Sequence, residues 1–146
     1  MSPPDRAVVR RKLAVIVRNL RELEDLARTP LAAYLADLRT RKLTERFLQE
    51  AIEAAIDINR HLVRVSGGRP VDDNHASFLR MADVGVLPRD LATGLVRAAG
   101  LRNHLVHEYD TLDDTLVLES AGMAVERLPL YVAAVEDYLS RGETHP

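Results

Sequence analysis

Cysteine and tryptophan are absent from this chain of 146 residues, and aromatic residues make up only 4% of it. Without cysteine, the chain forms neither a disulfide nor a thiolate metal site. With so few aromatic rings, we do not expect it to bind single-stranded nucleic acid by base stacking. It also has no apolar run long enough to span a membrane and no secretory-type start, so we expect a soluble, cytoplasmic protein.

Several common catalytic signatures are absent as well. The chain contains no glycine-rich phosphate loop, nucleophile elbow or dinucleotide-binding fingerprint. His104 and His107 are spaced to share a helix face, but no carboxylate completes a metal site at recognisable spacing, and His61, His75 and His145 are scattered. We therefore expect no metal and no cofactor.

The net charge of −2 argues against a protein that coats nucleic acid, but the charge is unevenly distributed. Residues 1–64 carry 13 Lys and Arg against 9 Asp and Glu, whereas residues 110–146 carry 2 against 8. Glu53 and Asp57 form a carboxylate pair that we expect to face water. We expect each basic side chain of this part to be solvated on a helix face, the alternative being a local basic surface that steers RNA toward a cleft; the residues concerned are Arg39, Arg41, Lys42, Arg60, Arg64 and Arg69.

Apolar residues recur at helical spacing throughout, and no β-type alternation or internal repeat is present. The sequence thus predicts an all-α fold, an antiparallel bundle of about five to seven helices forming a single domain over residues 1–146. The ends, about 1–4 and 141–146, are expected to be disordered. One apolar stripe runs from Val9 to Ala27, and a second runs from Leu48 to Val65.

Helix boundaries follow from capping residues and from glycine and proline. Thr44 is the predicted N-cap of the second long helix, and Gly67 and Gly68 end it. The next helix is predicted to start after a cap at Asp72, Asp73 or Asn74 and to stop at Gly85. Another helix begins near Arg89. Because Pro129 removes a backbone donor within the last apolar stripe, we expect either two helices there or one helix kinked at the proline.

The segment Leu101–Asp110 concentrates residues that handle phosphate. On a helix, Arg102 and Tyr109 fall about 20° apart, and Asn103 and His107 share the neighbouring face, whereas His104 lies on a further face and is expected to be solvated. A guanidinium forks onto phosphate oxygens, an imidazole moves protons, and a carboxamide orients a neighbour or a ribose hydroxyl. The partial negative charge of a nearby helix end favours a protonated imidazole at residue 107, which suits a general acid.

The spacing Arg-x4-His-x-Tyr, with Asn after the Arg, resembles the signature of the HEPN superfamily and, within it, the HepT toxins of toxin–antitoxin pairs. Further stretches resemble HepT segments in order and spacing: Glu45–Ala54, Ile56–Leu62 and Gly85–Pro88. The resemblance covers roughly Thr44 to Tyr131. It implies a metal-independent endoribonuclease in which Arg102 stabilises the phosphate, His107 acts as acid or base, and Asn103 orients His107 or the ribose.

The resemblance also implies a homodimer whose cleft joins the two motif helices, and a partner, the nucleotidyltransferase antitoxin MntA. In such pairs the antitoxin transfers AMP to the motif tyrosine, which here is Tyr109. Two alternatives remain open: a catalytically silent helical adaptor that binds a nucleotidyltransferase and nucleotide, and a purely structural helical dimer.

Overall fold

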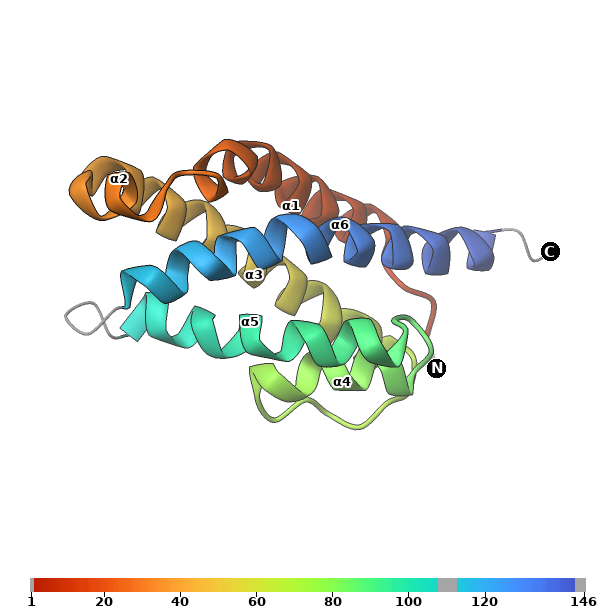
Figure 1. The fold of residues 1–146 in the computed structure, drawn as a ribbon. Coiled ribbons are helices and arrows are strands. Elements are labelled where there is room, and N and C mark those ends of the chain that lie inside the picture. Colours follow the sequence, from red (N-terminus) through yellow and green to blue (C-terminus); the bar gives the residue numbers. More distant parts are fainter. Residues whose placement is uncertain (1, 108–112, 144–146) are drawn as a thin grey trace.

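The computed structural model describes residues 2–107 and 113–143, and all regular structure in them is helical. The six helices form a bundle (Figure 1), which confirms the all-α prediction; they are α1 (Arg6–Ala27), α2 (Leu31–Ala36), α3 (Leu38–Val65), α4 (Asn74–Asp83), α5 (Arg89–His107) and α6 (Asp114–Glu143). None of them combines the length and the apolar character that crossing a membrane requires.

The core lies where the two longest apolar stripes meet. α1 packs on α3 and α6, while α4 and α5 pack on each other and on α3 (Figure 1). Apart from Ala27 and Val65, which are partly buried, the residues of both predicted stripes are buried, as are their partners Val117, Ala121 and Tyr131 on α6. Each buried leucine or isoleucine contributes about 1.5–3 kcal/mol, so these stripes determine how the helices pack.

The start of α3 differs from the prediction. The helix begins at Leu38 and its N-cap is Asp37, whose carboxylate accepts a hydrogen bond from the backbone of Arg39 at 3.0 Å. Thr44 is fully buried inside the helix, and its hydroxyl donates to the Thr40 carbonyl at 2.8 Å. The prediction of Thr44 as N-cap was therefore wrong, because a threonine can instead satisfy its hydroxyl within the preceding helical turn.

Other boundaries agree with the sequence more closely. Asp73, one of the three predicted candidates, caps α4 by accepting from the Ala76 amide at 2.7 Å. Gly67 and Gly85 follow α3 and α4 with φ of 77° and 81°, a region that favours glycine. α6 is one helix with Pro129 inside it, so the second of the two expected arrangements, a single helix, is the one present.

Both chain ends contain more order than the sequence predicted. α6 continues to Glu143, past residue 141, where we expected order to stop. Near the other end, the backbone amide of Ser2 donates to the Val65 carbonyl at 2.8 Å. α1 and α6 also join directly, because the Arg10 guanidinium binds the Glu136 carboxylate at 2.8 Å.

A cluster of buried polar side chains crosses the core and links α3, α4 and α6. The Tyr131 hydroxyl lies 2.6 Å from Asn59 Oδ1 and 3.0 Å from the Ala55 carbonyl oxygen. Asn59 Nδ2 donates in turn to Ser77 Oγ at 3.1 Å. All three side chains are enclosed, so each depends on these bonds for its polar atoms.

Candidate functional site

The motif helix α5 is anchored where it begins. Asp83, at the end of α4, accepts hydrogen bonds from Arg89 at 2.7 Å and from Arg80 at 3.1 Å. These hydrogen bonds, with Arg89 contributing most, lower the pKa of the Asp83 carboxyl below its ordinary value. Buried side chains along α5, among them Leu95, Leu101 and Leu105, hold the rest of the helix against the core. The described part of the motif, from Arg102 to His107, therefore lies on a supported helix.

Arg102 occupies the edge of the bundle, where α5 passes α3. Its Nε lies 3.4 Å from Glu53 Oε1, and its Nη1 lies 3.5 Å from Asn103 Oδ1. The Arg102 side chain is 28% exposed and that of Glu53 is 36% exposed. The guanidinium is thus oriented by two neighbours and still open to solvent on part of its surface. Such a group can accept an anionic ligand without unfolding anything around it.

A cavity of about 430 Å³ adjoins Arg102 between α3, α4 and α5. Its other polar lining residues are Glu53, Asp57, Arg60 and Asn74. Arg60 donates to Asn74 Oδ1 at 2.6 Å, and Asp57 pairs with Lys12 at 2.9 Å. An incoming phosphate therefore has to compete with the Glu53 carboxylate at Arg102 and with the neutral Asn74 carboxamide at Arg60. The pair of Arg102 with Glu53 is long and partly exposed, so Arg102 can exchange this partner for a phosphate.

Two predicted site residues cannot be placed with Arg102 in the same way. His107 is the last residue of α5, but its side chain lies outside the part of the chain that the structure describes. Tyr109 lies outside the described residues altogether. The structure therefore brings together Arg102 and Asn103 and adds Glu53, while the roles assigned to His107 and Tyr109 remain predictions.

Glu53 is the residue that the sequence analysis misjudged. We expected it to face water with Asp57. Asp57 is exposed as expected, where it pairs with Lys12, whereas Glu53 is half-buried and pairs with Arg102 across the helices. Helical spacing relates residues one to three turns apart, and it carries no information about residues on different helices. The one available signal was that Glu53 lies within a stretch resembling HepT.

The basic residues considered for a local surface are divided into two groups. Arg41 and Lys42 lie in the first turns of α3, whereas Arg60 and Arg64 lie near its end. At 1.5 Å per residue, Arg41 and Arg60 are about 28 Å apart along the helix axis. Arg41 pairs with Asp114 at 3.7 Å and Lys42 with Glu45 at 3.5 Å. Because these four residues lie at opposite ends of one helix, they do not form one local basic surface.

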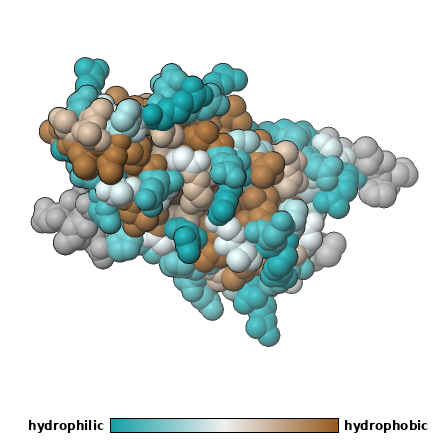
Figure 2. Space-filling model, in the orientation of Figure 1, coloured by the Kyte–Doolittle hydropathy of each residue, from teal (hydrophilic) through white to brown (hydrophobic). Residues whose placement is uncertain are grey.

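Apolar side chains remain exposed around α2. Leu31 and Leu35 of α2, together with Leu38 and Leu43 of α3, are each at least 40% exposed. We call these four residues the α2 leucine patch. Figure 2 shows hydrophobic residues gathered over α2, and in Figure 1 this is the end of the bundle where α5 ends and α6 begins. Exposed apolar surface of this kind is typical of protein–protein contacts.

Comparison with known sequences identifies relatives over most of the chain. The family model described as "Ribonuclease HepT-like" matches residues 16–135. A protein of Aphanizomenon flos-aquae named tRNA nuclease HepT is 34% identical over 133 residues, covering 90% of each chain. A putative RNase of Archaeoglobus fulgidus is 34% identical over 132 residues, covering 90% of this chain and 93% of the relative.

Solved structures share the fold. A tri-AMPylated HEPN toxin of Shewanella oneidensis, in complex with its MNT antitoxin, superposes with a TM-score of 0.79 at 22% identity and covers 89% of this chain and 97% of its own. YutE of Bacillus subtilis, described as a cytosolic protein of unknown function, has a TM-score of 0.79 at 16% identity, covering 100% of this chain and 97% of its own. The arrangement of the six helices is therefore shared by proteins of very different sequence.

Proposed function

Because the chain belongs to the HepT-like ribonuclease family, we propose that it is an endoribonuclease toxin that cleaves RNA with Arg102, Asn103 and His107, without a metal. The observation that carries this proposal is the position of Arg102. Its guanidinium is oriented by Glu53 at 3.4 Å, partly open to solvent, and at the edge of a cavity of about 430 Å³. These properties suit a group that binds the scissile phosphate.

The proposed reaction is an internal transfer at phosphorus. A base removes the proton of the ribose 2′-hydroxyl, and the 2′-oxygen forms a bond to phosphorus. The bond from phosphorus to the 5′-oxygen breaks, and an acid returns a proton to that oxygen. The products are a 2′,3′-cyclic phosphate and a free 5′-hydroxyl. Arg102 stabilises the additional negative charge on the pentacoordinate phosphate, and Asn103 orients the imidazole or the ribose.

We assign both proton transfers to His107, which requires two copies of the chain. One imidazole accepts the proton while the other donates one, so the proposed active unit is a homodimer with Arg102 and His107 from each protomer. The α2 leucine patch, at the end of the bundle where α5 ends, offers apolar surface for this contact. Light scattering with activity assays tests it: we expect a dimer, and a monomer that cleaves RNA at every concentration would contradict the two-protomer site.

Regulation is proposed to act through Tyr109 and a nucleotidyltransferase antitoxin of the MNT type. The supporting observation is the solved HEPN toxin from Shewanella oneidensis, which is tri-AMPylated and bound to its MNT antitoxin. An AMP on Tyr109, about 20° around the helix from Arg102 by sequence spacing, adds bulk and negative charge beside the guanidinium. The adduct then excludes RNA by both size and repulsion.

The deciding experiment is expression of the chain alone and together with its cognate nucleotidyltransferase. We expect growth arrest and RNA cleavage for the chain alone, and rescue by the partner with added AMP masses on the purified protein. In Tyr109→Phe the AMP masses should vanish, and the variant should escape rescue if it remains toxic. A chain that binds the partner but leaves cellular RNA intact would instead support the silent adaptor.

A further inference from the structure

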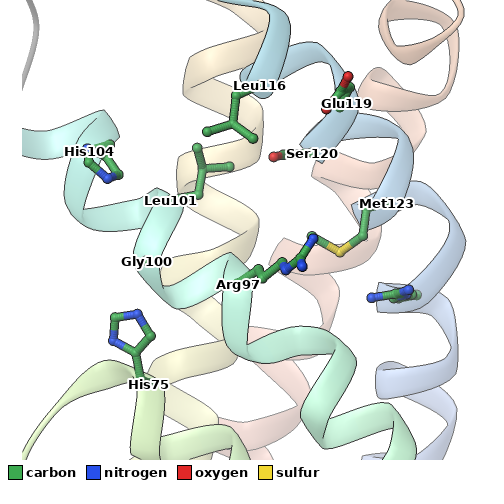
Figure 3. A pocket seen from close by; sticks show the side chains of 10 residues that line it. His75, Arg97, Gly100, Leu101, His104, Leu116, Glu119, Ser120 and Met123 are labelled. Atoms are coloured by element: carbon green, nitrogen blue, oxygen red, sulfur yellow. The ribbon is translucent and has the colours of Figure 1, made fainter. Parts of the chain in front are cut away.

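A second cavity, of about 510 Å³, borders the motif helix on another flank. It lies between α5 and α6 with a contribution from α4 (Figure 3), and it shares no lining residue with the cavity at Arg102. α5 contributes Arg97, Gly100 and His104, which recur every three to four residues on one side of the helix. By helical geometry Gly100 and His104 lie about 160° around the axis from Arg102.

The charged groups of this cavity are mostly cationic or able to become so. Among the residues that the structure describes, Arg97, Arg127 and the imidazoles of His75 and His104 line it, together with the carboxylate of Glu119. Arg97 is exposed, and within the part of the chain that the structure describes it has no ion pair or hydrogen bond. In Figure 3 its side chain extends from α5 toward α6 and Met123. A free guanidinium at the rim of a concave site is a ready partner for an anion.

Two glycines of α5 allow cationic groups to lie against its backbone. The Arg127 guanidinium donates to the Gly94 carbonyl at 2.7 Å, and a Cβ on Gly94 would lie only 2.8 Å from Arg127 Nη1. A Cβ on Gly100 would likewise lie 3.0 Å from His75 Nε2. The absence of these side chains therefore lets Arg127 and His75 approach α5 closely. Arg127 is held in one orientation, which lowers the entropic cost of binding an anion.

Apolar side chains, none of them aromatic among the described residues, form the remaining surface of the cavity. Leu101 is buried at its base, and Leu116 and Met123 of α6 line its side. Such a surface accepts the face of a base or a ribose by simple contact, without reading its sequence. The combination of cationic groups and a smooth apolar wall matches one nucleotide of a polynucleotide better than a small inorganic anion.

We propose that this cavity is a second RNA-binding subsite, in which Arg97 binds a backbone phosphate of the same strand at a distance of some nucleotides from the one cleaved at Arg102. This inference rests on the proposed function and names residues that the motif does not contain. Arg97 and Arg102 are about 7.5 Å apart along the helix axis and about 140° apart around it, so a strand contacts both only if it passes around the exposed side of α5. Because the contact is to phosphate, the subsite increases affinity for any RNA sequence.

The test measures RNA affinity and its salt dependence in protein inactivated by His107→Ala. Arg97→Ala should weaken binding of a single-stranded RNA roughly 5- to 10-fold and reduce the slope of log affinity against log salt by about 0.7, the value for one phosphate contact. Arg97→Lys should retain most of the affinity. Arg18→Ala is the matched control, because it removes the same charge from an exposed position on α1 without a partner among the described residues.

Activity assays provide a second readout. In the active protein, Arg97→Ala should raise KM and leave kcat unchanged, since binding is lost equally in the ground and transition states. Ser120→Glu, which places a carboxylate in the cavity, should weaken RNA binding further than Arg97→Ala does. If Arg97→Ala and Arg18→Ala lower the affinity and the salt slope equally, the effect comes from the overall charge of the protein, and the proposal of a subsite is wrong.

Failure of the subsite and failure of the proposed function give different results. Wild-type protein that neither binds nor cleaves RNA contradicts the function itself. Wild-type protein that cleaves RNA, with no effect of Arg97→Ala or Ser120→Glu, contradicts only the subsite. A change confined to binding of free AMP, or to assembly with a second copy or a nucleotidyltransferase, would reassign the cavity to that occupant and likewise overturn the proposal.

Discussion

α3 contributes to two polar clusters that differ in how far they are enclosed and in whether they carry charge. Asn59 belongs to the cluster with Tyr131 and Ser77, which is enclosed and includes a contact of 2.6 Å. Glu53, less than two turns earlier, contacts Arg102 at 3.4 Å in a pair that is about one-third exposed. The enclosed cluster stabilises the fold, because its buried polar atoms cannot bond to water if they lose these partners. The open cluster can exchange its partners for a ligand.

Removal of the motif side chains should give the largest effect and affect only the open cluster. Arg102→Ala and His107→Ala are each expected to reduce RNA cleavage by at least roughly 100-fold, because a charge-stabilising or proton-transferring group is lost. The melting temperature should stay close to that of the wild type, and EDTA should not change the rate. Cleavage that persists in either variant, or that stops on chelation, would contradict the metal-free assignment.

In the enclosed cluster, removal of a single hydroxyl should lower the stability of the protein and leave its activity unchanged. Tyr131→Phe leaves Asn59 Oδ1 and the Ala55 carbonyl without their donor, so we expect a loss of about 1–3 kcal/mol in the free energy of unfolding. The rate of RNA cleavage should be unchanged at temperatures where the variant is folded. Tyr138→Phe is the control, because its hydroxyl makes one part-buried bond to Ser66 and should matter less. Equal losses in urea titrations of the two would mean that enclosure is not the cause.

Glu53 tests whether the open cluster serves activity or stability, because it lies on α3 and pairs with Arg102 on α5. We expect Glu53→Gln to reduce kcat roughly tenfold by releasing the guanidinium from its orientation. The free energy of unfolding should change by less than about 1 kcal/mol, because the pair is partly exposed. Glu50→Gln is the matched control, since Glu50 pairs with Arg46 at 3.0 Å on the same helix. If Glu53 is purely structural, Glu53→Gln will lower stability without lowering kcat. If Glu53 orients Arg102, Glu53→Asp should retain more of the rate than Glu53→Gln does.

The smallest expected effect is a loss of stability at alkaline pH, caused by deprotonation of the buried tyrosines. Burial first, and then the charge of Glu45, raises the pKa of Tyr34 to about 12, and burial raises the pKa of Tyr131 well above its ordinary value. Because the folded-state pKa is the higher one, this contribution to stability is present below about pH 10 and is lost as the pH rises toward 12. Denaturant midpoints measured across that range should fall, and should fall less in Tyr131→Phe. An unchanged midpoint would show that these tyrosines titrate as if exposed.

Periodicity was sufficient to predict most of the fold. The stripes of α1 and α3 came from the spacing of apolar residues alone, because a helix repeats every 3.6 residues whatever it packs against. The start of α3 was missed because Asp37 and Thr44 are both acceptable caps. The choice between them depends on Thr44 being buried against other helices, which is a property of the assembled bundle.

The candidate site was predictable only along its own helix. Arg102 and Asn103 were found from local spacing. The roles of Glu53 on α3 and of Arg97 beside α6 could not be predicted, because the sequence does not place these helices next to α5. The second cavity depends on Gly94 and Gly100, and the sequence suggested no more than a soft spot at Gly100. Contacts between helices distant along the chain were therefore the missing information.

The pairing of Arg10 on α1 with Glu136 on α6 has a consequence for the timing of folding. During synthesis α1, α3 and α5 emerge from the ribosome well before α6, and until α6 follows, their apolar faces on that side have no cover. The bundle closes only when nearly the whole chain has been made, because its first and last helices are packing partners. A ribosome that stalls before α6 would thus release an unfinished core, and any harmful activity of the chain begins only after translation is almost complete.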